Sequence, residues 1–166
     1  MTELHTKVLL IGVGNTLRGD DGAGPRLAEA LSRGLIAAGW TTRLLLSQQL
    51  VPELAVEIAA QGLVAVVICD ARVPVPGEVG GLRLIPQAAP REGRLPLAFT
   101  HEITVGTLCY YALSLKEPGQ MLAPCWLATV PAFDLGLGEG LSPATEAALS
   151  GAAVLARSLA EHLARD

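Results

Sequence analysis

The chain has 166 residues, of which 51% are apolar, 17% charged and 4% aromatic. This length fits one domain over residues 1–166, whose core is large enough to fold without a disulfide or a structural metal. The formal net charge of −4 excludes a broad basic surface for nucleic acid. No signal-peptide pattern opens the sequence and no apolar run is long enough to span a bilayer, so we expect a cytoplasmic protein without membrane insertion.

Strands and helices alternate in the first half of the chain. Continuous apolar runs at Lys7–Val13 and Leu63–Cys69 are typical of central strands that are buried on both faces of a parallel sheet. Between them, helical spacing of apolar residues predicts a helix over Gly22–Ala38. A second strand is expected at Thr41–Leu46 and a short helix at Pro52–Ala60.

The second half continues with an edge-like strand at Gly80–Ile85 and a proline-rich loop over residues 86–99. A helix is predicted over Glu102–Leu115, with His101 at its entry, and a last strand over Pro124–Val130. One long final helix is expected after Pro143, because the preceding serine can cap it and proline is tolerated in its first turn.

This order of elements predicts an α/β fold: a single three-layer, doubly wound domain with a mostly parallel sheet of about five strands and helices on both faces. Val8–Val13 and Leu63–Cys69 are expected to be adjacent central strands. Sites in such folds form outside the carboxyl ends of the strands. The first of these strands leads there into the acidic loop Gly14–Gly22, which contains Asp21, and the second leads into the segment that begins with Asp70.

The loop after the first strand argues against a dinucleotide site. Gly12 and Gly14 begin a glycine pattern, but the third glycine position is occupied by Leu17. Two carboxylates, Asp20 and Asp21, would also stand where a pyrophosphate binds at the helix N-terminus, and they would repel it. We therefore expect no nucleotide cofactor.

Two carboxylates and one histidine form the candidate site. Because neighbouring residues rarely point the same way, we expect one of Asp20 and Asp21 to cap the following helix and the other to point inward. With Asp70 and His101, the inward carboxylate completes an oxygen, oxygen and nitrogen set that suits a divalent transition metal. Taken singly, these residues also fit plainer structural roles as a helix cap, a strand-end turn and a solvated histidine.

The three cysteines, Cys69, Cys109 and Cys125, are odd in number and far apart in sequence. A disulfide framework or a zinc site is therefore not expected, and small buried side chains are the main interpretation. A nucleophilic role for Cys69, which stands beside Asp70, is kept as an alternative.

The sequence also resembles a known family. The segment Gly12–Gly24, which reads GVGNTLRGDDGAG, closely resembles the N-terminal signature of the hydrogenase maturation proteases. Further resemblance follows in the same order at Val67–Ala71, Thr100–Ile103 and Gly138–Ser142. The first motif is the most specific, because it is much longer than a lone glycine pattern.

These proteases are endopeptidases that trim the C-terminus of the nickel-iron hydrogenase large subunit. The resemblance implies that Asp21, Asp70 and His101 are the metal-binding and catalytic residues, and that they contact nickel already installed in the precursor. It implies that Asp20 and Asn15 shape the acidic loop. The precursor is then the protein partner and the source of the nickel.

Two departures from the family pattern stand out. Many members carry glutamate where this chain has Asp21, and many carry Asp-Gly-Gly-Thr where this chain has Ser47–Leu54, SQQLVPEL. The second departure bears on substrate specificity. Two alternatives to a peptidase remain: a chaperone that binds nickel or the precursor without cutting, using the same three residues, and an unrelated nucleotide-binding domain.

Overall fold

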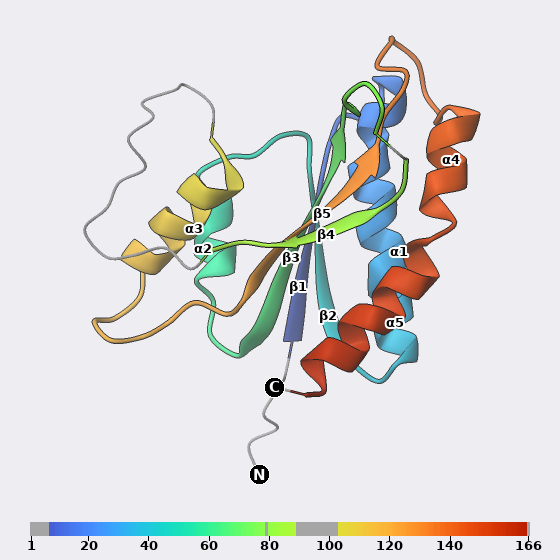
Figure 1. Cartoon of the computed structure of the whole chain (residues 1–166). Coiled ribbons are helices and arrows are strands. Elements are labelled where there is room, and N and C mark those ends of the chain that lie inside the picture. Colours follow the sequence, from blue (N-terminus) through green and yellow to red (C-terminus); the bar gives the residue numbers. More distant parts are fainter. Residues whose placement is uncertain (1–6, 79, 89–102, 166) are drawn as a thin grey trace.

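The computed structural model describes residues 7–78, 80–88 and 103–165. One five-stranded sheet forms the centre of the molecule, in the order β2-β1-β3-β5-β4 (Figure 1). Neighbouring strands are parallel except for β4, which runs antiparallel to β5 at one edge. The strands are β1 (Lys7–Val13), β2 (Thr41–Ser47), β3 (Leu63–Arg72), β4 (Arg83–Pro86) and β5 (Cys125–Pro131).

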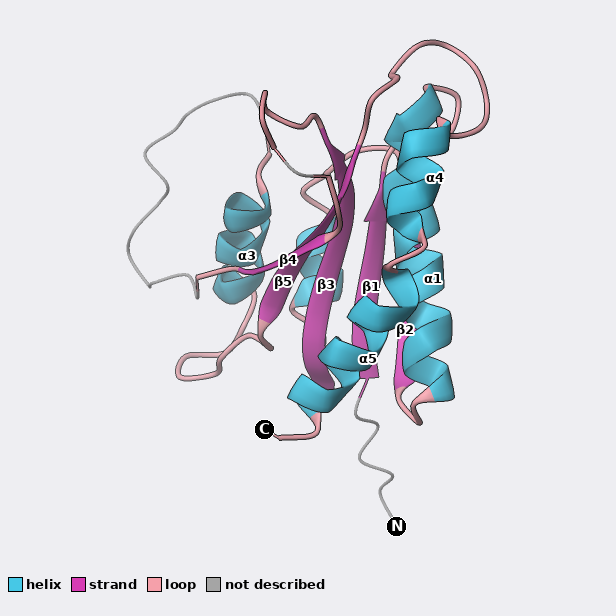
Figure 2. Ribbon diagram, turned by 45° about the vertical axis from the view of Figure 1, so that its right-hand side comes forward, coloured by secondary structure: helices cyan, strands magenta, loops and turns pink. Residues whose placement is uncertain are grey.

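Helices cover both faces of this sheet (Figures 1 and 2). One face carries α1, α4 and α5, and the other carries α2 and α3. The predicted three-layer α/β fold is therefore confirmed. The helices are α1 (Ala23–Ala37), α2 (Leu54–Ile58), α3 (Val105–Ser114), α4 (Pro143–Leu149) and α5 (Ala152–Leu163), with a short 3-10 helix, η1 (Gly19–Gly22), before α1.

The continuous apolar run of β1 is explained by burial on both faces. Val8 and Leu10 pack in the core beneath α1 and α5, while Leu9 and Ile11 pack in the core beneath α2 and α3. All four side chains are fully buried. As predicted, β1 and β3 are adjacent and parallel in the middle of the sheet.

Some predicted boundaries were wrong. Strand β3 does not end before Asp70 but continues to Arg72, because its last residues still pair with β5. The edge strand β4 begins at Arg83 instead of Gly80. Helix α3 begins at Val105, after Thr104 caps it by accepting a hydrogen bond from the backbone N–H of Thr107.

The single final helix that we predicted is in fact two helices. Ser142 caps α4 as expected, and Pro143 occupies its first turn. The helix stops at Leu149, and α5 starts only after Ser150 and Gly151. The Ser150 hydroxyl donates to the carbonyl oxygen of Ala147 at 2.6 Å, a side-chain bond that competes with helix continuation. No helix within the described ranges is both long and apolar enough to cross a membrane.

Candidate active site

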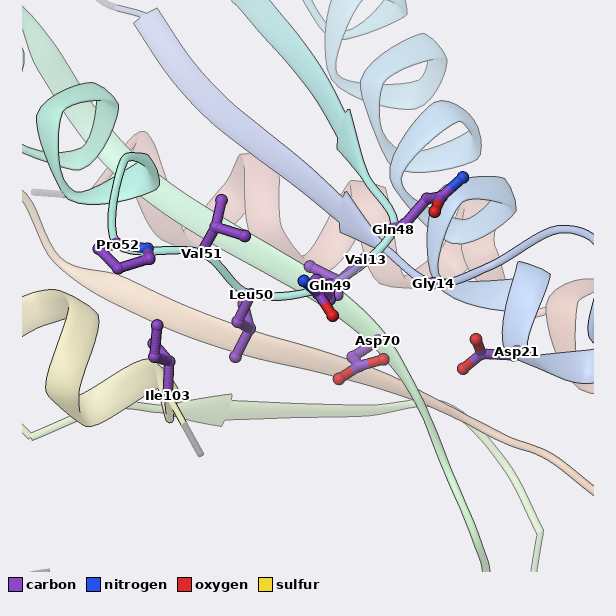
Figure 3. Close-up of a pocket in the computed structure, with 10 residues that line it drawn as sticks. All are labelled: Val13, Gly14, Asp21, Gln48, Gln49, Leu50, Val51, Pro52, Asp70 and Ile103. Carbon is purple, nitrogen blue, oxygen red and sulfur yellow. The ribbon is translucent and has the colours of Figure 1, made fainter. Parts of the chain in front are cut away.

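A pocket of about 530 Å³ opens at the carboxyl ends of β1 and β3 (Figure 3). One end is acidic, with Asp21 and Asp70, and the Asp21 carboxylate points toward that of Asp70. The rest of the wall is largely apolar and comes from the segment after β2 and from Ile103. The lining residues are Val13, Gly14, Asp21, Gln48, Gln49, Leu50, Val51, Pro52, Asp70 and Ile103.

The acidic loop holds Asp21 by hydrogen bonds from its own backbone. The backbone N–H of Asn15 donates to Oδ2 of Asp21 at 2.8 Å. The Asn15 side chain accepts in turn from the backbone N–H of Leu17 at 3.0 Å, which closes the turn. Asn15 therefore shapes the loop, in agreement with the prediction from the motif.

Glycine is required at position 14 by the same packing. Gly14 has a φ of +147°, and a Cβ atom there would lie 1.9 Å from the carbonyl oxygen of Asp21. The close approach allows the loop to fold back over the end of β1. It thereby sets the position from which Asp21 enters the pocket.

A second glycine brings the two acidic segments together. A Cβ on Gly24, in the first turn of α1, would lie 2.1 Å from the carbonyl oxygen of Val13 and 3.0 Å from Cα of Asp70. The N-terminus of α1 therefore lies directly against the ends of β1 and β3. Asp21, just before this helix, is consequently near Asp70 despite the 49 positions between them.

The pocket raises the proton affinity of Asp70. Burial raises the pKa of this carboxyl to about 6, and the negative charge of Asp21 adds to the increase. The backbone N–H of Ala71, which donates to Oδ1 at 2.8 Å, offsets part of the effect. Within the described residues, neither Asp21 nor Asp70 forms an ion pair with a lysine or arginine. Among the residues that the structure describes, no positive charge pairs with these two carboxylates.

The adjacent carboxylate, Asp20, is structural, but it does not cap α1 as predicted. Gly22 occupies the N-cap position, and no side chain bonds to the helix end there. Asp20 is fully buried and points the other way, toward the segment after β5. The prediction of one inward and one structural carboxylate is confirmed, whereas the capping role was wrong.

Asp20 is fully satisfied in that position. Its Oδ2 accepts from the backbone N–H groups of Phe133 and Asp134 at 2.8 and 2.9 Å and from the Ser142 hydroxyl at 2.7 Å. Its Oδ1 accepts from the backbone N–H of Ser142 at 2.6 Å. Burial by itself would raise the pKa of Asp20, but these hydrogen bonds hold it well below its ordinary value. The acidic loop is thus anchored to the segment that precedes α4.

His101, the third predicted site residue, lies outside the described residues. Ile103, two positions further along the chain, lines the pocket with Asp21 and Asp70. No group of three histidine, cysteine, aspartate or glutamate side chains within the described ranges is placed to hold a metal ion. The metal-binding role of the three predicted residues therefore stays a prediction.

All three cysteines are buried and free, as expected. Cys69 is fully buried in β3, and this burial, together with the charge of Asp70, raises the pKa of its thiol. Such a thiol is not ionised near neutral pH and has no access to a substrate. Its position gives no support to a nucleophilic role.

Sequence reasoning missed most of the pocket wall. Gln48, Gln49 and Leu50 belong to the segment that departs from the family pattern, and that departure was the one signal that could have indicated them. The anchor for Asp20 was also missed. Ser142 lies in a weak motif, and its bond to Asp20 joins residues 122 positions apart.

The fold and the pocket define an open α/β protein with a carboxylate pair at the carboxyl ends of its central strands. No protein-family model matches the sequence, and no curated protein matches it either. Solved structures do match. The hydrogenase maturating endopeptidase HybD from E. coli is 22% identical and has a TM-score of 0.65, with 95% of this chain and 93% of that chain covered.

Two archaeal structures give the same result. The hydrogenase maturation protease HycI from Thermococcus kodakarensis is 27% identical, with a TM-score of 0.57 and coverage of 95% of this chain and 92% of that chain. A hydrogenase 2 maturation peptidase from a Thaumarchaeota archaeon is 24% identical, with a TM-score of 0.60 and coverage of 93% and 97%. The chain has the fold of the hydrogenase maturation proteases, and the resemblance predicted from its motifs is confirmed.

Proposed function

We propose that this chain is an endopeptidase that removes the C-terminal extension from the nickel-loaded precursor of a nickel-iron hydrogenase large subunit. Nickel arrives with the precursor and is bound by Asp21, Asp70 and His101. The chain acts on its partner in the cytoplasm. Structural similarity to maturation endopeptidases, including HycI at 27% identity, supports the class of activity.

The observation that carries the proposal is the pair of facing carboxylates, Asp21 and Asp70, at the acidic end of the pocket. Burial and the charge of Asp21 raise the pKa of Asp70, and neither carboxylate pairs with a described lysine or arginine, so an incoming cation is stabilised between them. Carboxylate oxygens and an imidazole nitrogen suit a divalent transition metal. Ile103 supports the inclusion of His101, because it brings the chain to the pocket wall two positions after the histidine.

The rest of the pocket fits a peptide segment. Its volume of about 530 Å³ and its open, partly apolar wall of Leu50, Val51 and Pro52 can take several residues of an extended chain. Asp21 and Asp70 hold the metal end of the precursor, and the apolar wall holds the neighbouring polypeptide. Nickel, when bound with the precursor, supplies positive charge next to the bond that is cut. Cleavage is thereby restricted to precursors in which the metal has been inserted.

The test is incubation with a purified, nickel-loaded precursor of the large subunit, followed by mass spectrometry. The wild-type chain is expected to shorten the precursor, whereas Asp21→Asn and His101→Ala are expected to lose most of this activity while remaining folded. Glu117→Gln is the matched control, because Glu117 is an exposed carboxylate after α3, outside the pocket lining. A wild-type chain that binds the precursor without changing its mass would instead be a maturation chaperone.

A further inference from the structure

A second, smaller pocket adjoins the first at the end of β2. It has a volume of about 190 Å³ and shares Gly14 and Gln48 with the larger pocket. The lining residues are Gly14, Thr16, Pro25, Leu46, Ser47 and Gln48. The two pockets therefore meet at these two residues and follow one path across the carboxyl ends of β1 and β2.

The walls of the second pocket are suited to an aliphatic side chain. Leu46, near the end of the edge strand β2, is 54% exposed although it is a large apolar residue. Pro25, in the first turn of α1, and Thr16, in the acidic loop, form other parts of the wall. Apart from Asp21 and Asp70, none of the described residues that line the two pockets carries a charged side chain. An apolar group placed against Leu46 removes exposed apolar surface from water, which is favourable.

Gln48 stands at the junction of the two pockets. Its side chain points away from the carboxylates, toward α1 (Figure 3), and it makes no hydrogen bond to another described residue. The backbone around it is fixed, because Gly14 N–H donates to the Ser47 carbonyl at 3.0 Å and the Ser47 hydroxyl donates to the Gln49 carbonyl at 2.7 Å. The amide is thus presented on a rigid support, and neither its donor nor its acceptor is used by another residue in the described part of the chain.

We propose that the second pocket is a substrate subsite, in which Gln48 binds the main chain of the precursor and Leu46 contacts one of its aliphatic side chains. The occupant is the peptide segment next to the cleaved bond, which passes from the carboxylate pair across Gln48. A glutamine amide offers both a donor and an acceptor, as a peptide group requires, and its neutrality keeps it from competing for the metal. This inference rests on the proposed function, and it assigns substrate selection to the segment that departs from the family pattern.

The test compares Leu46→Asp with Leu44→Asp on the nickel-loaded precursor, with affinity and cleavage measured separately. Leu44 is the matched control, because it lies on the same strand and is also exposed but lines neither pocket. Leu46→Asp is expected to weaken precursor affinity and raise KM by about 10-fold with kcat nearly unchanged, the effect of losing one apolar contact. Leu46→Ser, a milder change, should act in the same direction. Equal behaviour of the Leu46 and Leu44 variants would overturn the subsite.

A second comparison on the same precursor tests Gln48→Ala, with Gln61→Ala as its control. Gln61 is an exposed glutamine just before β3, at the opposite end of the sheet. Loss of main-chain hydrogen bonds is expected to raise KM by about 3- to 10-fold for Gln48→Ala alone. If the wild type binds the precursor without cutting it, the proposed function fails, while the affinities of these variants still support or refute the subsite. A wild type that neither binds nor cuts refutes both.

Discussion

Asp20 is next to Asp21 in the sequence, and Asp21 lines one pocket with Asp70. The environments of Asp20 and of the Asp21–Asp70 pair are nevertheless opposite. Asp20 is buried and accepts four hydrogen bonds, which lower its pKa. Asp70 shares a pocket with a second carboxylate, and its pKa is raised to about 6. The comparison separates a carboxylate that stabilises the fold from one, Asp70, whose ionised form is held at a cost to stability, as functional groups commonly are.

The largest effect on stability is expected for Asp20→Asn. The amide NH2 of asparagine would face a buried N–H donor, and the negative charge that now accepts the four hydrogen bonds would be lost. Together these effects should lower the free energy of unfolding by about 3 kcal/mol. Thermal or chemical unfolding measures this directly. Asp134→Asn, an exposed change in the segment that Asp20 contacts, is the control and should stay within about 1 kcal/mol of wild type.

The difference in the free energy of unfolding between wild type and Asp20→Asn should also depend on pH. The folded-state pKa of Asp20 lies below its ordinary value of 3.8, so its stabilising contribution is complete above that pH and is lost as the pH falls below it. The gap between wild type and Asp20→Asn should therefore narrow in acid. A gap of constant size would show that Asp20 does not act through its charge.

A smaller loss is expected for Ser142→Ala. This change removes the hydroxyl that donates to Asp20 and that also caps α4. Loss of a helix cap together with a hydrogen bond to a charge should cost about 1.5 kcal/mol in the free energy of unfolding. Ser150→Ala should cost less, because this exposed hydroxyl bonds to the Ala147 carbonyl and to no other residue within the described ranges. Equal losses of stability in the Ser142 and Ser150 variants would contradict the role of Ser142 in anchoring Asp20.

In contrast to the two changes above, Asp70→Asn is expected to raise the free energy of unfolding. Asp70→Asn keeps the acceptor for Ala71 N–H but removes a partly buried charge, and at pH 7 it should stabilise the fold by about 1 kcal/mol. Because the folded-state pKa of Asp70 is raised from 3.8 to about 6, ionisation destabilises the wild type increasingly as the pH rises through that interval. Unfolding curves at several pH values should show the advantage of Asp70→Asn vanish toward pH 4. A variant less stable than wild type at pH 7 would contradict the comparison.

The smallest effect on processing is expected for Cys69→Ala. Cys69 is adjacent to Asp70, but its thiol is fully buried in β3 and faces the core beneath α1. Precursor cleavage, followed by mass, should therefore proceed as in wild type. A folded Cys69→Ala variant that does not cut would transfer the chemistry to a thiol nucleophile.

The sheet was predictable because its signals are local. The apolar runs of β1 and β3 can only be satisfied by burial on both faces, and their adjacency follows from the alternation of strands and helices. The boundaries were less predictable. β3 extends past Asp70 because β5 pairs with it, and α4 ends before α5 because of Ser150 and Gly151.

The site was predictable only where a motif marked it. Asp21 and Asp70 stand at strand ends with unusual local sequence, and the structure places both in one pocket. For Gln48 the one signal was the departure of its segment from the family pattern, and Leu46 had none, because their place in the second pocket arises from the approach of β2 to α1 and the acidic loop. The partner of Asp20 was equally invisible, since a hydrogen bond across 122 positions leaves no spacing pattern.

The central claim is that the carboxylate pair recognises nickel carried by the precursor. Its most direct test gives the wild-type chain equal amounts of nickel-loaded and nickel-free precursor and follows the mass of each over time. We predict that only the loaded precursor is shortened, and that nickel supplied to the peptidase alone does not replace it. Equal shortening of both precursors would contradict the account.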